Sequence, residues 1–316
     1  MKYTAQDVHV DQLLTNVSIG YTNPGYIADQ VFPIVPVDKQ SDKYLVYDKS
    51  HWFRNEARIR APGTRSERGG WSYSTAAYFC DRFSYGHEIY DEERSNADNN
   101  FQLDSDGALF ATDKILMQRE VAFAANFFKT SVWGTDKTGA SDFTRWSDYA
   151  NSTPLVDVAA WMDVIEGSIG REPNRLVMGK QVWTQLKWHP DLIDTIKYTQ
   201  RAQMSTDLAA ALFEVERILI GRAIYTTSPE GTAEASVSYS RIWGKHALLT
   251  YVPATPSLRT PAAGYTFTWQ RVPNSLSYVK RMRDEEREAD IIEANAYYAH
   301  KVTGAAAGVF ASTAVA

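Results

Sequence analysis

The stretch ALFATDKILMQREVAFAANFF, from Ala108 to Phe128, contains no proline or glycine and is rich in Ala, Leu, Met, Lys, Gln and Glu. Most of these residues lose little side-chain freedom in a helix, so the stretch predicts the longest helix of the chain. Asp104, Ser105 and Asp106 precede it and are candidate N-caps. At ~1.5 Å per residue, about 21 residues form a rod of roughly 32 Å.

Before this helix the sequence predicts a long hairpin with a basic tip. The residues from 43 to 47 are strand-like, and those from 71 to 79 resume the pattern after a polar middle that contains several glycines. A net positive tip on an acidic protein should not pack on its own core, so we expect it to contact an acidic patch on an adjacent copy. A mobile, solvated loop is the alternative. The candidate contact residues are Arg54, Arg58, Arg60, Arg65 and Arg68, opposed only by Glu56 and Glu67.

The first residues, 1–37, predict an extended arm. Pro24, Pro33 and Pro36 break the short apolar clusters of this segment, so it cannot form a long helix. Such a segment buries little surface by itself. We therefore expect it to be ordered by lying across other structure, either its own or that of another subunit.

After the long helix the sequence predicts a second compact unit of mixed helices and strands. Apolar residues recur at helical spacing from Leu155 to Ile169 and stop at Gly170. No βα unit and no internal repeat recurs, so the fold class is α+β. The other expected elements are a strand at 175–178, helices at 180–188 and 208–215, strands at 218–226 and 236–251, and a strand at 265–269 with one aromatic face.

The composition argues against several classes of protein. The chain has 316 residues, and its 33 Lys and Arg are outnumbered by 38 Asp and Glu, so any contact with nucleic acid should be local, weak and without sequence specificity. It has no signal peptide and no apolar run of the ~18 residues that a membrane span needs. Cys80 is the only cysteine, which predicts a buried thiol beside Phe79 and Phe83 in a reducing compartment. Aromatic residues make up 13% of the chain, which favours extensive interfaces.

Motifs that carry chemistry are absent. The six histidines form no metal-binding pair; His87-Glu88 has Asp91 where a zinc protease would need its second histidine. Gly179-Lys180 opens a helix as a phosphate loop does, but Gln181 replaces the magnesium-binding Ser or Thr. The acidic runs 91–93 and 284–286 could pair as acid and base, but arginines flank both, which is typical of a solvated face. We predict no catalytic, cofactor-binding or metal-binding residues and no cofactor.

The order of these parts resembles the major capsid protein of tailed bacteriophages, with the Hong Kong 97 type fold. Three local phrases carry the resemblance: Tyr26 to Tyr44, Trp146 to Asp157, and Asn174 to Trp183 with Leu186 and His189-Pro190 after it. The family's parts would be an N-terminal arm at 1–37, an E-loop at 38–85, a P-domain with its spine helix at 86–150, an A-domain at 151–258, and a return to the P-domain at 259–316.

The resemblance implies a structural protein and not an enzyme. Hexamers and pentamers would build an icosahedral shell around a double-stranded DNA genome, in a virion made in the cytoplasm of a host bacterium. Partners would be a separate scaffolding protein, a portal and a decoration protein, with no membrane. Lys39, Lys43 and Lys49 lie where some members form a crosslink, but no motif assigns its other residues, so we predict none. An encapsulin-like bacterial compartment subunit and a hydrolase using scattered carboxylates are the alternatives.

Overall fold

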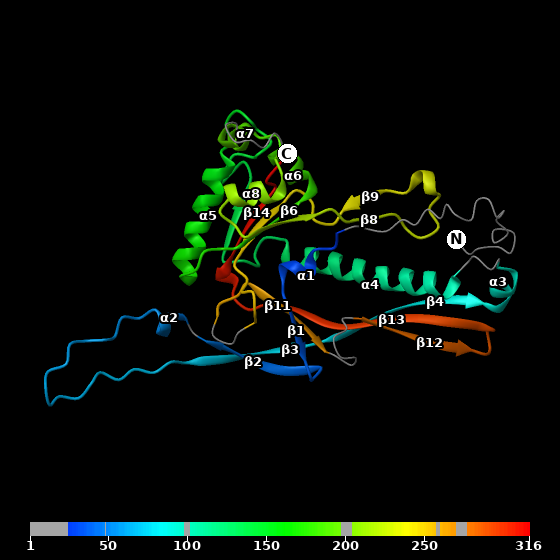
Figure 1. The fold of residues 1–316 in the computed structure, drawn as a ribbon, viewed down its shortest axis with the longest axis horizontal. Helices are drawn as coiled ribbons and strands as arrows, with labels where there is room; N and C mark the ends of the chain where they lie inside the picture. Colours follow the sequence, from blue (N-terminus) through cyan, green and yellow to red (C-terminus); the bar gives the residue numbers. More distant parts are fainter. Residues whose placement is uncertain (1–24, 48, 98–101, 197–203, 257–259, 270–276) are drawn as a thin grey trace.

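The computed structural model describes residues 25–47, 49–97, 102–196, 204–256, 260–269 and 277–316. Residues 1–24 of the expected arm and the expected boundary at 258 and 259 lie outside this part of the chain. A long sheet with one helix along it forms the main body, a compact α/β unit stands at one end, and a hairpin projects beyond that end (Figure 1).

Helix α4, Leu103–Phe127, is the predicted long helix and has 25 residues. It begins five residues before the expected start at Ala108, because Asp104 and Asp106 lie inside its first turn, where carboxylates favour the helix dipole. Gly107 is helical and not a break. A Cβ atom at Gly107 would lie 2.9 Å from the His87 ring, so the glycine allows the helix to approach the sheet closely.

The long sheet has the strand order β1-β11-β13-β12, and β4 also pairs with β13. Its strands are β1 Ile34–Val37, β4 Asp81–Tyr90, β11 Gly264–Trp269, β12 Ser277–Asp284 and β13 Ala289–Val302. Helix α4 lies along this sheet (Figure 1), where Ala111 and Ile115 pack on Ala294 and Ala296 of β13. The small side chains of β13 let the helix lie near the strand.

The predicted hairpin is confirmed. Strands β2 Ser41–Tyr47 and β3 Tyr73–Phe79 pair antiparallel, with short helix α2 Lys49–Trp52 after β2. At its base Cys80 is buried, as expected, but its neighbours are Tyr78, Tyr265 and Phe267. Phe79 is 53% exposed, because successive residues of a strand face opposite sides, and the expectation that it covers the thiol is wrong. Burial raises the pKa of Cys80 to about 11.

The second sheet has the order β5-β14-β10-β6-β7 and forms the α/β unit. Its strands are β5 Thr135–Thr138, β6 Arg175–Gly179, β7 Arg217–Gly221, β10 Ala247–Thr250 and β14 Gly308–Ser312. The helices of the unit are α5 Pro154–Ile169, α6 Lys180–Leu186, α7 Pro190–Ile196 and α8 Thr206–Leu212. Gly170 ends α5 in the left-handed region at φ 67°, as predicted.

Two predicted strands are each divided. The expected strand at 218–226 consists of β7 and β8 Ile224–Thr226, and the expected strand at 236–251 contains β9 Tyr239–Arg241 and β10. Trp243 and Gly244 lie between β9 and β10, and the buried indole of Trp243 covers Gly221 so closely that a Cβ atom there would collide with it. Strands β8 and β9 form a separate hairpin. The remaining short elements are α1 Ala28–Val31, α3 Asp91–Asn96, η1 Glu234–Ser236 and η2 Ala305–Ala307.

One buried carboxylate joins three of these elements. Glu120 of α4 is 1% exposed, and its oxygens accept hydrogen bonds from Ile27 N at 3.0 Å, Ala28 N at 2.9 Å and Trp243 Nε1 at 2.6 Å. Burial raises the pKa of Glu120, whereas these donors and Arg119 oppose the rise. Arg119, also buried, pairs with Asp29 of α1. The contacts therefore fix α1 and the β9–β10 loop to the long helix.

We expect Glu120→Gln to lower the free energy of unfolding by about 2 to 3 kcal/mol, because an amide group cannot accept from all three donors and leaves at least one unpaired. Urea unfolding of the unassembled chain measures this change. Glu230→Gln changes an exposed glutamate of the β8–β9 loop and is the matched control. Equal stability of the two variants would contradict a structural role for Glu120.

His300 of β13 is held neutral beside the same helix. Its Nδ1 lies 2.9 Å from Thr266 Oγ1, and its ring centroid lies 5.2 Å from that of Phe123. Burial, assisted by the positive charge of Arg119, lowers the pKa of His300 to about 3. Because the folded pKa is below the unfolded one, this contribution to stability is complete above about pH 6.5 and is lost as the pH falls toward 3.

We therefore expect the wild-type chain to lose about 2 kcal/mol of stability through His300 when the pH is lowered from 7.5 to 5. The lower pH lies ~1.5 units below the unfolded pKa of histidine, and each unit corresponds to about 1.4 kcal/mol. His300→Asn keeps an amide group that can hydrogen-bond to Thr266, but it cannot titrate. The smaller asparagine side chain lowers the free energy of unfolding by the same amount at both pH values. The stability of this variant should therefore fall less than that of the wild type over this pH range. Urea unfolding at the two pH values tests this, and an identical pH dependence of both proteins would refute it.

Candidate assembly surfaces

The tip of the β2–β3 hairpin, defined here as residues 53–72, extends away from the rest of the protein (Figure 1). All of its residues are exposed. At its base, Lys49 Nζ donates to Ser168 O of α5 at 3.3 Å, so the start of the tip is held against the α/β unit. Pairing over the whole of β2 and β3 gives the projection a fixed root.

The five arginines predicted as contact residues all lie on this tip. Arg54 pairs with Glu56 at 3.2 Å. Within the part of the chain that the structure describes, no ion pair is recorded for the other four, which are Arg58, Arg60, Arg65 and Arg68. Five arginines against two glutamates give the tip a net charge of +3.

The tip also carries apolar side chains that the sequence argument did not single out. Trp52, just before it, is 55% exposed, and within it Phe53 is 65%, Trp71 is 63% and Ile59 is fully exposed. The rings of Trp52 and Trp71 lie 6.1 Å apart, on the two sides of the hairpin. Exposed aromatic groups next to arginines are typical of surfaces that bind another protein. The high aromatic content was the signal in the sequence, but it could not say which rings are exposed.

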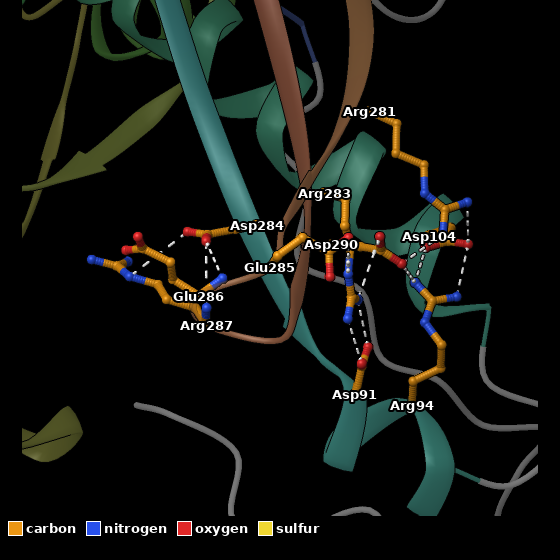
Figure 2. A network of polar contacts seen from close by, with 10 residues as sticks. All are labelled: Asp91, Arg94, Asp104, Arg281, Arg283, Asp284, Glu285, Glu286, Arg287 and Asp290. Carbon is orange, nitrogen blue, oxygen red and sulfur yellow. Dashed lines mark hydrogen bonds and ion pairs between the residues drawn. The ribbon is translucent and has the colours of Figure 1, made fainter.

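The far end of the long sheet holds a network of charges (Figure 2). Arg283 of β12 makes a two-pronged contact with Asp91 of α3, at 2.7 and 2.6 Å. Asp290 of β13 accepts from Arg281 at 2.6 Å and lies 3.1 Å from Arg94. Arg94 also contacts both oxygens of Asp104 in the first turn of α4, at 3.1 and 2.7 Å. We call this set the distal network.

The distal network brings together the two acidic runs of the sequence, at 91–93 and 284–286. Arg283 lowers the pKa of Asp91, and Arg94 lowers that of Asp104. Asp284 accepts from the backbone of Glu286 at 3.1 Å and so shapes the turn between β12 and β13. Carboxylates with lowered pKa values are poor proton donors at neutral pH, so the geometry favours a structural role for these acids.

At the two other motifs considered for chemistry, Gly179-Lys180 and His87-Glu88, the protein's own atoms fill the space that a ligand would need or pair with the side chains. A Cβ atom at Gly179 would collide with the carbonyl of Gly244, so the β9–β10 turn fills the space where a phosphate loop would hold its ligand. Glu88 pairs with Arg287 at 2.8 Å, and His87 faces the ring of Phe110 with centroids 5.7 Å apart. Among the residues that the structure describes, no cluster of His, Cys, Asp or Glu could hold a metal ion.

A buried serine–histidine pair is present, but its hydrogen bond runs in the wrong direction to activate the serine as a nucleophile. Ser152 Oγ donates to Asp148 O at 2.6 Å and lies 2.8 Å from His189 Nε2. His189 Nδ1 accepts from Asp191 N at 3.2 Å, so Nε2 carries the proton and donates to the serine. A catalytic histidine must instead accept the serine proton. The pair therefore connects the loop before α5 to the start of α7.

The described helices include none that is long and apolar enough to cross a membrane. No family model matches the sequence. The chain is 29% identical over 312 residues to the major capsid protein of Burkholderia phage BcepMu, covering 96% of both chains. It is 27% identical over 273 residues to the major capsid protein of Pseudomonas phage JBD67, covering 85% of this chain and 86% of that one.

Solved structures show the same fold. A phage-related protein from Bordetella bronchiseptica RB50 has a TM-score of 0.67 at 24% identity, covering 96% of this chain and 97% of that one. The mature capsid of bacteriophage PhiM1 has a TM-score of 0.61 at 12% identity, with 97% and 92% covered. The SrpI encapsulin of Synechococcus elongatus PCC 7942 is more distant, with a TM-score of 0.53 at 9% identity and 95% and 94% covered. The chain is thus a homologue of the major capsid proteins of tailed bacteriophages and has the Hong Kong 97 type fold.

Proposed function

We propose that the chain builds the icosahedral shell of a tailed bacteriophage, as hexamers and pentamers that enclose a double-stranded DNA genome. The capsid proteins that it resembles over nearly their whole length support this function. The observation in the molecule that carries the proposal is the projecting tip, which exposes arginines and large apolar side chains on a firmly paired hairpin. A protein that acts alone has no use for such a projection.

In the terms of the family, residues 1–37 would be the N-terminal arm, 38–85 the E-loop, 86–150 the P-domain with the spine helix, and 151–258 the A-domain, with a return to the P-domain at 259–316. Strand β14 pairs with β10, and β5 pairs with β14, in the sheet of the α/β unit. The ends of the first and last P-domain segments would therefore hold the two domains together.

The contact of the tip with a neighbouring copy combines two effects. Burial of exposed apolar area supplies most of the free energy, at about 25 cal/mol per Å². The arginines Arg54, Arg58, Arg60, Arg65 and Arg68 would pair with acids of the neighbour and so set the register of the contact. A tip that lies across the next subunit can also adjust to the different angles that a closed shell requires.

The remaining parts of the proposal concern partners and place. The shell would use a separate scaffolding protein, a portal and a decoration protein, and it would touch packaged DNA weakly and without sequence specificity, since the net charge of the chain is -5. It would be a component of the virion, made in the cytoplasm of the host bacterium. We propose no enzymatic activity. His189 donates its hydrogen bond to Ser152 and so cannot accept the serine proton, and the arginine-bound carboxylates, whose pKa values are lowered, are poor proton donors.

Negative-stain electron microscopy of the purified high-molecular-weight fraction tests the function. Uniform round or angular shells are the expected result. An encapsulin-like compartment has the same fold, and it would be indicated by a cargo enzyme that co-purifies with the shells. Small discrete particles alone, also in the presence of the scaffolding protein, would argue against a shell.

The tip provides a sharper prediction. Replacing Arg58, Arg60 and Arg65 by glutamate should lower the yield of shells at least about tenfold, because like charges would then meet across the contact. The conservative triple replacement by lysine keeps the charge and should assemble far better. Sedimentation velocity gives the assembled fraction, and circular dichroism confirms that the variants fold. Assembly of the glutamate variant at the wild-type level would exclude an electrostatic role for the tip.

A further inference from the structure

A second group of cations lies on the α/β unit. Strands β6 and β7 are parallel, with Gly179 beside Gly221, so Lys180 and Arg222, which follow them, lie side by side at the same edge of the sheet. Arg241 ends β9, opposite Ile224 of β8. Lys187 follows α6. We call Lys180, Lys187, Arg222 and Arg241 the basic face.

The charges of these four side chains repel one another. Burial lowers the pKa of Lys180, and the charges of Arg222, Lys187 and Arg241 lower it further. Within the described part of the chain, no ion pair is recorded for any of the four. The basic face also exposes apolar groups of the β8–β9 hairpin, since Ile224 is 41% and Tyr239 is 63% exposed.

The outer side of α5 has the opposite charge. This helix contains three acids and no base. Asp163 and Glu166 are exposed and, in the residues that the structure covers, form no recorded ion pair. Next to them Val156 is 65% and Val164 is 39% exposed. We call Val156, Asp163, Val164 and Glu166 the acidic face.

The two faces point in different directions. Helix α5 forms one side of the α/β unit, and the β8–β9 hairpin projects from the other side (Figure 1). A surface on one side of a subunit that complements a surface on its other side makes a head-to-tail contact, and repeated rotation about one axis closes such contacts into a ring.

We propose that the acidic face of one copy binds the basic face of the next, and that this contact closes the rings of the shell. This inference rests on the proposed function and names the surfaces that perform it. Val156 and Val164 would pack on Ile224 and Tyr239, with the charges around them. An apolar centre with a polar rim is the usual arrangement of a protein interface.

A second copy fits these observations better than nucleic acid does. Phosphates would neutralise the basic face, but they would leave the exposed valines and acids of α5 without a partner. Contact between copies accounts for both faces at once. Binding of DNA by the basic face is therefore an outcome of the test, and it would overturn the proposal.

The test reverses one face at a time in the full chain. One variant carries Asp163→Lys and Glu166→Lys, and the other carries Lys187→Glu, Arg222→Glu and Arg241→Glu, which leaves Lys180 as the only cation of the basic face. Each should assemble at least about tenfold less than the wild type, because like charges meet at every contact of the ring. A chain with all five changes restores opposite charges and should again form rings and shells. The changed side chains are exposed except for Lys187, which is half-buried, and circular dichroism checks that every variant folds.

Mixing the two single-face variants gives a second, independent readout. Opposite charges then meet only where the two variants alternate, and alternation around a ring requires an even number of subunits. Native mass spectrometry of the mixture should therefore show six-membered rings without five-membered ones, and electron microscopy should show no closed shells. The chain with all five changes, which needs no alternation, should form both rings.

The outcomes separate the two proposals. Failure of the wild type to assemble, also in the presence of the scaffolding protein, would overturn the shell function, and this inference with it. Normal assembly of both single-face variants, beside a wild type that forms shells, would overturn the inference alone. Shells of normal yield that lose only bound DNA when Arg222 and Arg241 are changed would assign the basic face to nucleic acid instead.

Discussion

The architecture depends on the buried carboxylate of Glu120. Its two oxygens bind donors from α1 and from the β9–β10 loop, and its own helix lies along the long sheet. A buried ion normally destabilises a fold, but this one is offset by three hydrogen bonds and by Arg119 beside it. Because its partners come from distant parts of the sequence, the carboxylate fixes where α1 and the β9–β10 loop lie on α4.

Sequence reasoning located the elements whose signals are local. The helix that ends at Gly170, the aromatic face of β11 and the β2–β3 hairpin follow from spacing, capping and alternation within a few residues. It did not locate β12 and β13, because β13 mixes buried alanines with charged residues and is a strand mainly through its pairing with β4 and β12. Sequence reasoning predicted β7 and β8 as one strand. The break between them lies where Gly221 packs against Trp243, and this contact joins residues more than twenty positions apart, so no local pattern indicates it.

The same limit applies to the candidate surfaces. The arginines of the tip could be predicted, since excess charge is visible in the sequence. The exposed rings of Trp52 and Trp71 could not, because an apolar residue in a sequence indicates a core until its neighbours are known. The distal network could not be predicted from the sequence either, since Arg283 and Asp91 are 192 positions apart. The protein thus uses its charges in two ways: those of the distal network are paired within one chain and stiffen it, whereas four of the five arginines of the tip form no ion pair with the described residues.

The position of β14 between β5 and β10 has a consequence for how the subunit is made. A ribosome completes β10, then the strands β11, β12 and β13 of the other sheet, and only afterwards the strand that belongs in the middle of the α/β unit. That unit cannot close while it is being synthesised, and its formation must wait for long-range pairing, which is slow. Newly made chains are therefore unable to present finished surfaces to one another until the whole of both bodies has emerged. The order of strands thus makes the α/β unit one of the last parts of the chain to be completed.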